Sequence, residues 1–156
     1  MNRAVAARGG VVMQFVGDEV FAVFGAPKSV DDHALLAVRA AIDMQHAQRK
    51  INDAWEQADL VPFRLGIGVT SGTVAAALLG SSQHVEYSIV GDVVNLAQRL
   101  QAWAAGGEIV ISEETFTGLH GGIPAEPMPQ MTVKGRREVV TAYRLAFPQP
   151  PVPVVV

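Results

Sequence analysis

The segment 87–100 constrains the fold more than any other part of the chain. It combines a short apolar strand, a Gly91-Asp92 turn and an amphipathic helix, so it predicts a strand-to-helix unit of an α/β protein. Asn95 and Arg99 are four residues apart and therefore project from the same side of that helix. A carboxamide beside a planar guanidinium suits a polyphosphate whose negative charge grows during a reaction.

The same helix also permits a purely structural interpretation. Asp92 is a suitable N-cap, and Leu96 and Leu100 recur at the spacing of a helix that buries one side. The two interpretations are compatible, because the apolar and polar residues occupy different sides. The spacing of Asn95 and Arg99 alone therefore does not decide a function.

Composition narrows the class of protein. The chain has 156 residues, of which 49% are hydrophobic and 17% charged, and this is typical of a folded globular domain. A net charge of −3 gives no electrostatic reason to expect nucleic acid or an anionic membrane as a partner. The absence of cysteine excludes disulfides and thiolate metal sites, and no apolar run is long enough to span a bilayer. We expect a soluble, cytoplasmic protein.

Hydrophobic periodicity predicts a ferredoxin-like α/β (α+β) fold: a mostly antiparallel sheet with helices on one face. A long helix is expected over about 32–57, a second helix over the Asn95/Arg99 segment, and a short one after Ser112, which is a suitable cap. The tail from Pro148 contains four prolines and is expected to be irregular. The predicted strands are 11–16, 20–24, 63–70, 72–79, 85–90, 108–112, 131–134 and 139–145.

The segment 87–100 resembles a helix of the class III nucleotidyl cyclases, the adenylyl and guanylyl cyclase family, whose usual pattern is Y-T-x-x-G-x-x-V-N-x-A-x-R-L. Ser88 stands here for the common threonine. Because further segments resemble this family in the same order, residues 1–147 are identified as a catalytic domain and 148–156 as a tail. Those segments are Phe15-Val16-Gly17-Asp18, Phe24-Gly25-Ala26-Pro27, Leu65-Gly66-Ile67-Gly68, Ser71-Gly72, Ile109-Val110-Ile111-Ser112 and Val133-Lys134-Gly135.

The resemblance implies an adenylate or guanylate cyclase, a phosphorus–oxygen lyase of intracellular signalling that makes a 3′,5′-cyclic monophosphate and pyrophosphate by two-metal-ion catalysis at a dimer interface. It assigns Arg99 to the charge on the transition-state phosphate and Asn95 to the ribose. In this family both act on a nucleotide held by the aspartates of the other subunit. Lys134 is implied as a phosphate contact, and a solvated hairpin charge beside Arg136 and Arg137 is an equally good interpretation.

Asp18 matches the second metal-binding aspartate of the family, for Mg²⁺ or Mn²⁺, although a Gly-Asp pair is also an ordinary turn former. No second carboxylate is evident, because Glu19 should point the other way and the pair Asp31 and Asp32 suits a helix cap. The family domain opens with a further strand and helix that carry the first aspartate, and we expect this unit to be missing, because Met1 lies only 17 residues before Asp18. We therefore expect little activity from the chain alone, and a homodimer or a heterodimer with a full-length cyclase.

The positions that select the base in this family are Gln14 and Ser88 here. Both side chains donate and accept hydrogen bonds, so they suit adenine without excluding guanine. ATP is preferred over GTP because it is the commoner family substrate. Two alternatives remain: a degenerate cyclase-like module that only dimerises or binds nucleotide, and a diguanylate cyclase, suggested by Val16-Gly17-Asp18-Glu19-Val20 but lacking that family's second glycine and phenylalanine.

Overall fold

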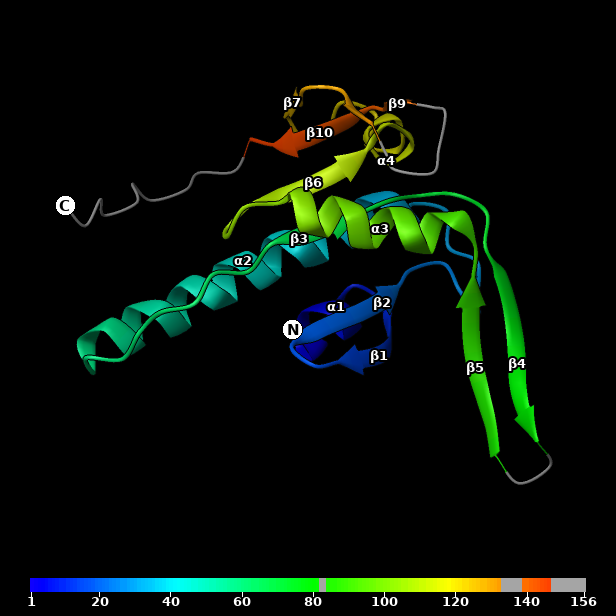
Figure 1. Cartoon of the computed structure of the whole chain (residues 1–156), viewed down its shortest axis with the longest axis horizontal. Coiled ribbons are helices and arrows are strands. Elements are labelled where there is room, and N and C mark those ends of the chain that lie inside the picture. The colour runs from blue at the N-terminus through cyan, green and yellow to red at the C-terminus, as the bar shows by residue number, and fades with distance from the viewer. Residues whose placement is uncertain (82–83, 133–138, 147–156) are drawn as a thin grey trace.

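The computed structural model describes residues 1–81, 84–132 and 139–146. Within them, helices are interspersed among the strands, as Figure 1 shows. The helices are α1 (Asn2–Ala7), α2 (His33–Gln57), α3 (Asp92–Trp103) and α4 (Glu113–Gly118). The strands are β1 (Val11–Val16), β2 (Glu19–Val23), β3 (Ile67–Val69), β4 (Ala75–Ser81), β5 (His84–Val90), β6 (Ile109–Ser112), β7 (Ala125–Pro127), β8 (Met131–Thr132), β9 (Val139–Val140) and β10 (Ala142–Leu145).

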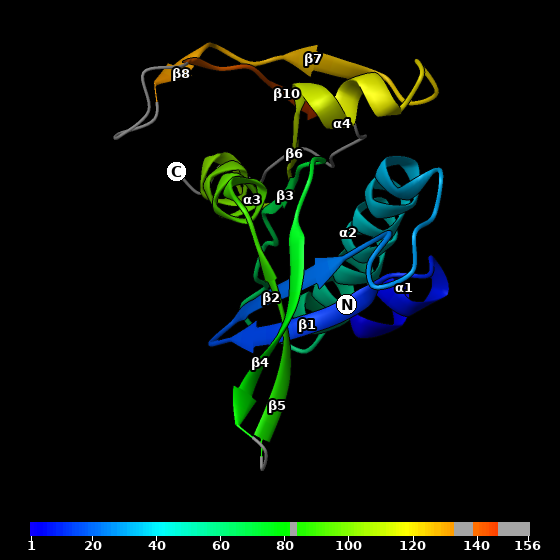
Figure 2. The same cartoon turned by 90° about the vertical axis from the view of Figure 1, so that its right-hand side faces the viewer.

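The central layer is a four-stranded sheet of order β3-β6-β10-β7. Its β3 and β6 are parallel, whereas β10 is antiparallel to both β6 and β7. The β1–β2, β4–β5 and β8–β9 pairs are separate antiparallel ribbons, and β4–β5 projects away from the rest of the protein in Figures 1 and 2. The predicted mixed α/β fold with mostly antiparallel pairing is thus confirmed.

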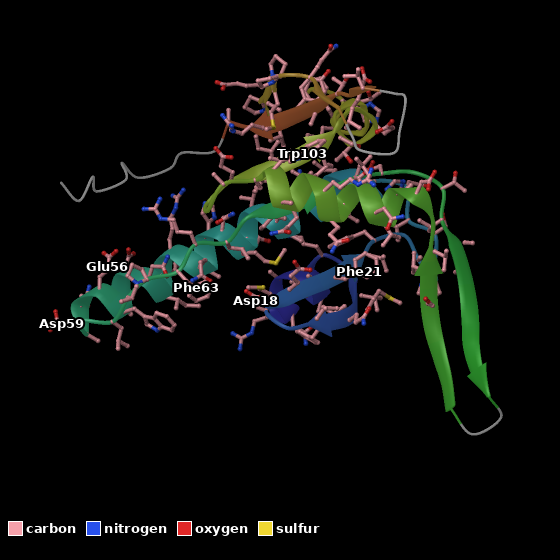
Figure 3. All side chains as sticks on the ribbon, in the orientation of Figure 1. Asp18, Phe21, Glu56, Asp59, Phe63 and Trp103 are labelled. Carbon is pink, nitrogen blue, oxygen red and sulfur yellow. The ribbon has the colours of Figure 1, made fainter. Side chains whose placement is uncertain are left out.

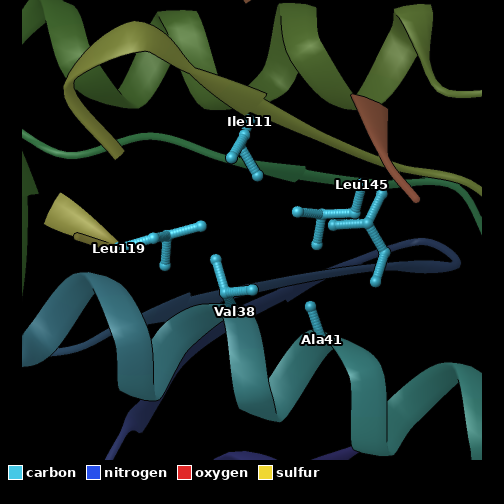
Figure 4. Packing of buried hydrophobic residues seen from close by; sticks show 6 residues of the cluster. Val38, Ala41, Ile111, Leu119 and Leu145 are labelled. Carbon is cyan, nitrogen blue, oxygen red and sulfur yellow. The ribbon is translucent and has the colours of Figure 1, made fainter. Parts of the chain in front are cut away.

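Helices cover both faces of the central sheet, so the expectation of helices on one face was wrong. Ile109 and Ile111 of β6 pack with Val38 and Ala41 of α2, a cluster that Figure 4 shows together with Leu119 and Leu145. Val110 points to the opposite face and packs with Leu100 of α3. All four residues of β6 are buried, so its sequence carries no polar side that would have indicated a solvent-facing sheet.

Two glycines before and within β3 bring α3 against the sheet. Because side chains alternate along a strand, Ile67 and Val69 join the α2 side while Gly66 and Gly68 face α3. A Cβ on Gly68 would lie 2.3 Å from the backbone nitrogen of Gln101. The backbone of α3 therefore occupies the space that any side chain at position 68 would need.

Side-chain amides on α2 hold the segment that leads into β3. Gln45 Nε2 donates to the carbonyl oxygens of Leu65 (2.7 Å) and Glu108 (3.2 Å), and Asn52 Nδ2 donates to that of Phe63 (2.8 Å). The Leu65 and Glu108 carbonyls also accept from the backbone amides of Gly107 (2.9 Å) and Ile67 (3.0 Å). The strand predicted over 63–70 is found only over Ile67–Val69.

Other local predictions have mixed outcomes. The long helix predicted over 32–57 is confirmed as His33–Gln57, and Ser112 caps α4 by accepting a hydrogen bond from the Thr115 amide. Asp92 is the first residue of α3 and not its N-cap, which is Gly91. The short elements α1 and β7 were not predicted. No helix among the described residues has the length and apolarity needed to cross a membrane.

Candidate functional site

Helix α3 presents the predicted Asn95 and Arg99 on the side that the core does not cover. Leu100 is fully buried (0% exposed), whereas Asn95 is exposed and Arg99 half-buried. The one-turn spacing places the amide and the guanidinium on one side of the helix. Since the opposite side is held by the core and by the glycine contact with β3, the orientation of both groups is set by packing.

The other predicted residues lie on different elements. Asp18 is exposed at the tip of the β1–β2 hairpin, where Figure 3 labels it, and follows Gly17 with its φ of 59°. Gln14 is exposed on β1, next to a register shift in the β1–β2 ladder, and Ser88 is half-buried on β5. Lys134 lies outside the described residues. The predicted residues are therefore distributed over the hairpin, β5 and α3.

A pocket of about 200 Å³ lies beside the first turns of α3. It contains none of the predicted residues, although two of its lining residues, Ser71 and Gly72, belong to a segment used for the family resemblance. Ser71 shares a 2.9 Å hydrogen bond with the buried Thr115, whose hydroxyl lies 3.3 Å from that of Ser112. The full lining is Thr70, Ser71, Gly72, Asp92, Val93, Leu96 and Glu114.

The fit of a divalent cation can be tested against the carboxylates. Magnesium requires several hard oxygen ligands in octahedral geometry, and two protein carboxylates are usual in a nucleotide-metal site. Within the described ranges, no group of three or more His, Asp or Glu side chains could hold a metal ion. Asp18 is exposed and can supply one ligand.

Comparisons with known proteins decide the family. The sequence profile described as the adenylate and guanylate cyclase catalytic domain matches residues 1–146. The chain belongs to this family. Adenylate cyclase 1 of Rhizobium meliloti (strain 1021) is 29% identical over 146 residues, covering 92% of this chain and 22% of that protein. Soluble guanylate cyclase gcy-34 of Caenorhabditis elegans is also 29% identical, over 92% of this chain and 21% of that protein.

Solved cyclases share the fold. The guanylyl cyclase Cya2 superposes with a TM-score of 0.86 at 32% identity, covering 92% of this chain and 73% of that one. The adenylyl cyclase CyaB from P. aeruginosa gives a TM-score of 0.85 at 28% identity, covering 95% and 77%. The chain thus spans about a fifth of the two curated relatives and about three quarters of the solved domains. Relatives of both base specificities are similar to it.

Proposed function

We propose that this cyclase domain supplies Asn95 and Arg99 to a composite site, at a dimer interface, that converts ATP to its 3′,5′-cyclic monophosphate. The main support is the position of an amide and a guanidinium one turn apart on the uncovered side of α3, a helix held by its packing against the sheet. Family membership gives this pair its chemical context.

In the proposed reaction, the ribose 3′-oxygen attacks the α-phosphorus while the bond to the pyrophosphate oxygen breaks. The 3′-hydroxyl proton is lost, and negative charge increases on the phosphate oxygens and the leaving group. Arg99 stabilises this charge with a charge-assisted hydrogen bond, and Asn95 orients the ribose. Removing one such preorganised donor typically costs about 10²- to 10³-fold in rate.

We propose that the carboxylate side of the site is incomplete in this chain, because Asp18 is the one candidate ligand that its sequence offers. The family generally uses divalent cations, and Asp18 is the residue we propose as a ligand for Mg²⁺ or Mn²⁺. We expect little cyclase activity from the chain alone. We expect activity when a partner subunit provides the complementary metal-binding half, because Asn95 and Arg99 then act on the nucleotide held by that partner.

Complementation tests this proposal. The chain is mixed with a full-length cyclase of the same family in which the arginine aligned with Arg99 is replaced by alanine, and cyclic nucleotide formation is measured with Mn²⁺. The wild-type chain should restore activity, and Arg99→Ala and Asn95→Ala should each reduce that rescue by about 10²-fold. Arg39→Ala is the matched control, because Arg39 is an exposed arginine on α2 and should leave the rescue unchanged. Equal rescue by wild type and Arg99→Ala would refute the role of the pair.

A second candidate is a degenerate module that dimerises or binds nucleotide without turnover, and the single metal-ligand candidate Asp18 favours it. It predicts no rescue in the mixture, together with ATP binding or association measurable by calorimetry. The preference for adenine or guanine is measured as the rate of cyclic nucleotide formation when the same mixture is supplied with ATP or with GTP. Because Gln14 and Ser88 can each donate and accept, we expect the preference for ATP to be small.

A further inference from the structure

A cluster of hydroxyl groups joins three parts of the chain near the start of α3. Thr115 of α4 is fully buried (0% exposed), and its hydroxyl oxygen lies 2.9 Å from that of Ser71 and 3.3 Å from that of Ser112, the last residue of β6. The same Thr115 oxygen lies 3.5 Å from the carbonyl oxygen of Val69, the last residue of β3. One side chain therefore links α4 to the ends of two neighbouring strands of the central sheet.

The segment 70–74, which connects β3 to β4, is held by this cluster. It belongs to no helix or strand, and within the described ranges no backbone hydrogen bond of a turn or loop involves it. The hydroxyl of Ser71 bonds the segment to Thr115. Because a segment without backbone bonds is positioned by its side-chain contacts, the Thr115 hydroxyl determines where Ser71 and Gly72 lie.

The same segment supports the first turn of α3. A Cβ on Gly72 would lie 2.7 Å from Val93 Cγ2, so the side chain of Val93 lies directly against the Gly72 backbone. The N-cap of the helix is Gly91, which makes no side-chain cap hydrogen bond to this turn. The pocket of about 200 Å³ borders the same turn, so the turn is not close-packed on all sides. Its position therefore depends on the contact with Gly72.

Asn95 and Arg99 are fixed by different contacts. Asn95 belongs to the first turn of α3, the turn that rests on Gly72. The helix backbone around Arg99 rests instead on Gly68, whose added Cβ would lie 2.4 Å from the carbonyl oxygen two residues before Arg99 and 2.3 Å from the backbone nitrogen two residues after it. The neighbouring Leu100 is fully buried. Loosening the segment 70–74 should thus move Asn95 and leave Arg99 in place.

We propose that Thr115 is a positioning residue for Asn95. Its hydroxyl holds Ser71 and Gly72 against Val93, and this contact sets the orientation of the Asn95 amide toward the ribose. Because Thr115 is fully buried, it can act on the reaction only through the residues that it contacts. The inference rests on the proposed function, which gives Asn95 its role.

Substitutions separate the hydroxyl of Thr115 from its packing. Thr115→Val keeps the shape and removes the hydroxyl, whereas Thr115→Ser keeps the hydroxyl and removes a buried methyl group. In the complementation assay Thr115→Val should reduce the rescue by about tenfold, and Thr115→Ser should stay within about twofold of the wild type. Ser71→Ala deletes the other half of the same hydrogen bond at a half-buried position and should reproduce the loss. Thr117→Val, at an exposed threonine of α4, is the matched control and should rescue as the wild type does.

A double-mutant cycle identifies the residue through which Thr115 acts. Combined with Asn95→Ala, Thr115→Val should cause no further loss, because the amide that it positions is absent. Combined with Arg99→Ala, the two losses should multiply to about 10³-fold, because Gly68 holds Arg99 independently. A general loss of stability would multiply in both backgrounds, so an equal further loss in the two backgrounds would overturn the proposal.

Amide hydrogen exchange tests the inference without any activity. In an α-helix the amides of Leu96 and Ala97 bond to carbonyls of the first turn, whereas the amide of Gln101 bonds one turn later. Thr115→Val should speed exchange at Leu96 and Ala97 by about tenfold relative to Gln101, and Thr115→Ser should not. If the wild-type chain restores no activity, the proposed function fails and this measurement alone decides the inference. Unchanged protection of Leu96 and Ala97 in both Thr115→Val and Ser71→Ala would overturn it.

Discussion

The contact between Gly68 and α3 can be tested with a single methyl group. In Gly68→Ala the new Cβ would lie 2.3 Å from the Gln101 nitrogen and 2.4 Å from the Ala97 carbonyl oxygen. Both atoms belong to the helix backbone, so no rotamer change can relieve the clash. Since ordinary contact begins at about 3.4 Å, α3 has to move by about 1 Å relative to β3.

This displacement has two expected consequences. Overpacking of this kind typically costs about 1–3 kcal/mol of unfolding free energy, which for a chain of this size is a fall of about 3–9 °C in melting temperature. Asn95 and Arg99 move with α3, and a misplacement of about 1 Å can cost about a hundredfold in rate. In the complementation assay Gly68→Ala should therefore lose most of its rescue at a temperature where circular dichroism shows it folded.

Gly72 provides the matched comparison. A Cβ there would meet a side chain and not backbone, Val93 Cγ2 at 2.7 Å. Gly72→Ala should therefore be harmful alone and largely restored by Val93→Ala, whereas no side-chain deletion on α3 should restore Gly68→Ala. If Gly68→Ala melts and complements like the wild type, α3 does not rest on β3 as described, and the packing argument for the orientation of Asn95 and Arg99 fails.

Two further predictions concern the scaffold. Gln45→Leu removes the side-chain donor to the Leu65 and Glu108 carbonyls, which keep the backbone amides of Gly107 and Ile67, and should cost about 0.5–1.5 kcal/mol, measured by urea unfolding; an unchanged midpoint would exclude a stabilising role for these bonds. Arg8 Nε donates to Asp43 Oδ2 at 2.8 Å, and this hydrogen bond and the attraction of Asp43 raise the pKa of Arg8 above its ordinary value. The contribution of a raised pKa is complete below the ordinary pKa of arginine and is lost only as the pH rises through the raised one. Because both lie far above pH 9, Arg8→Ala should lower the melting temperature slightly and equally at pH 6 and pH 9, and less in high salt; a difference that grows between pH 6 and pH 9 would contradict this.

Local periodicity was enough for much of this protein. It determined the helix His33–Gln57, the Ser112 cap and the helix that carries Asn95 and Arg99, because these features depend on residues a few positions apart. The spacing of Asn95 and Arg99 also placed both on one side of α3 without any tertiary information. The ordered family motifs led to the cyclase family, which the match over residues 1–146 confirms.

Only the tertiary structure decided features that depend on distant residues. Val110 packs on α3 while its neighbours Ile109 and Ile111 pack on α2, and a uniformly apolar strand cannot indicate which helix covers which face. The side-chain amide of Gln45 donates to the Leu65 carbonyl 20 residues away, a contact that local periodicity cannot indicate. The exposure of Val61 and its neighbours could not be inferred from sequence either, because an apolar residue becomes a surface residue only when no other part of the fold covers it.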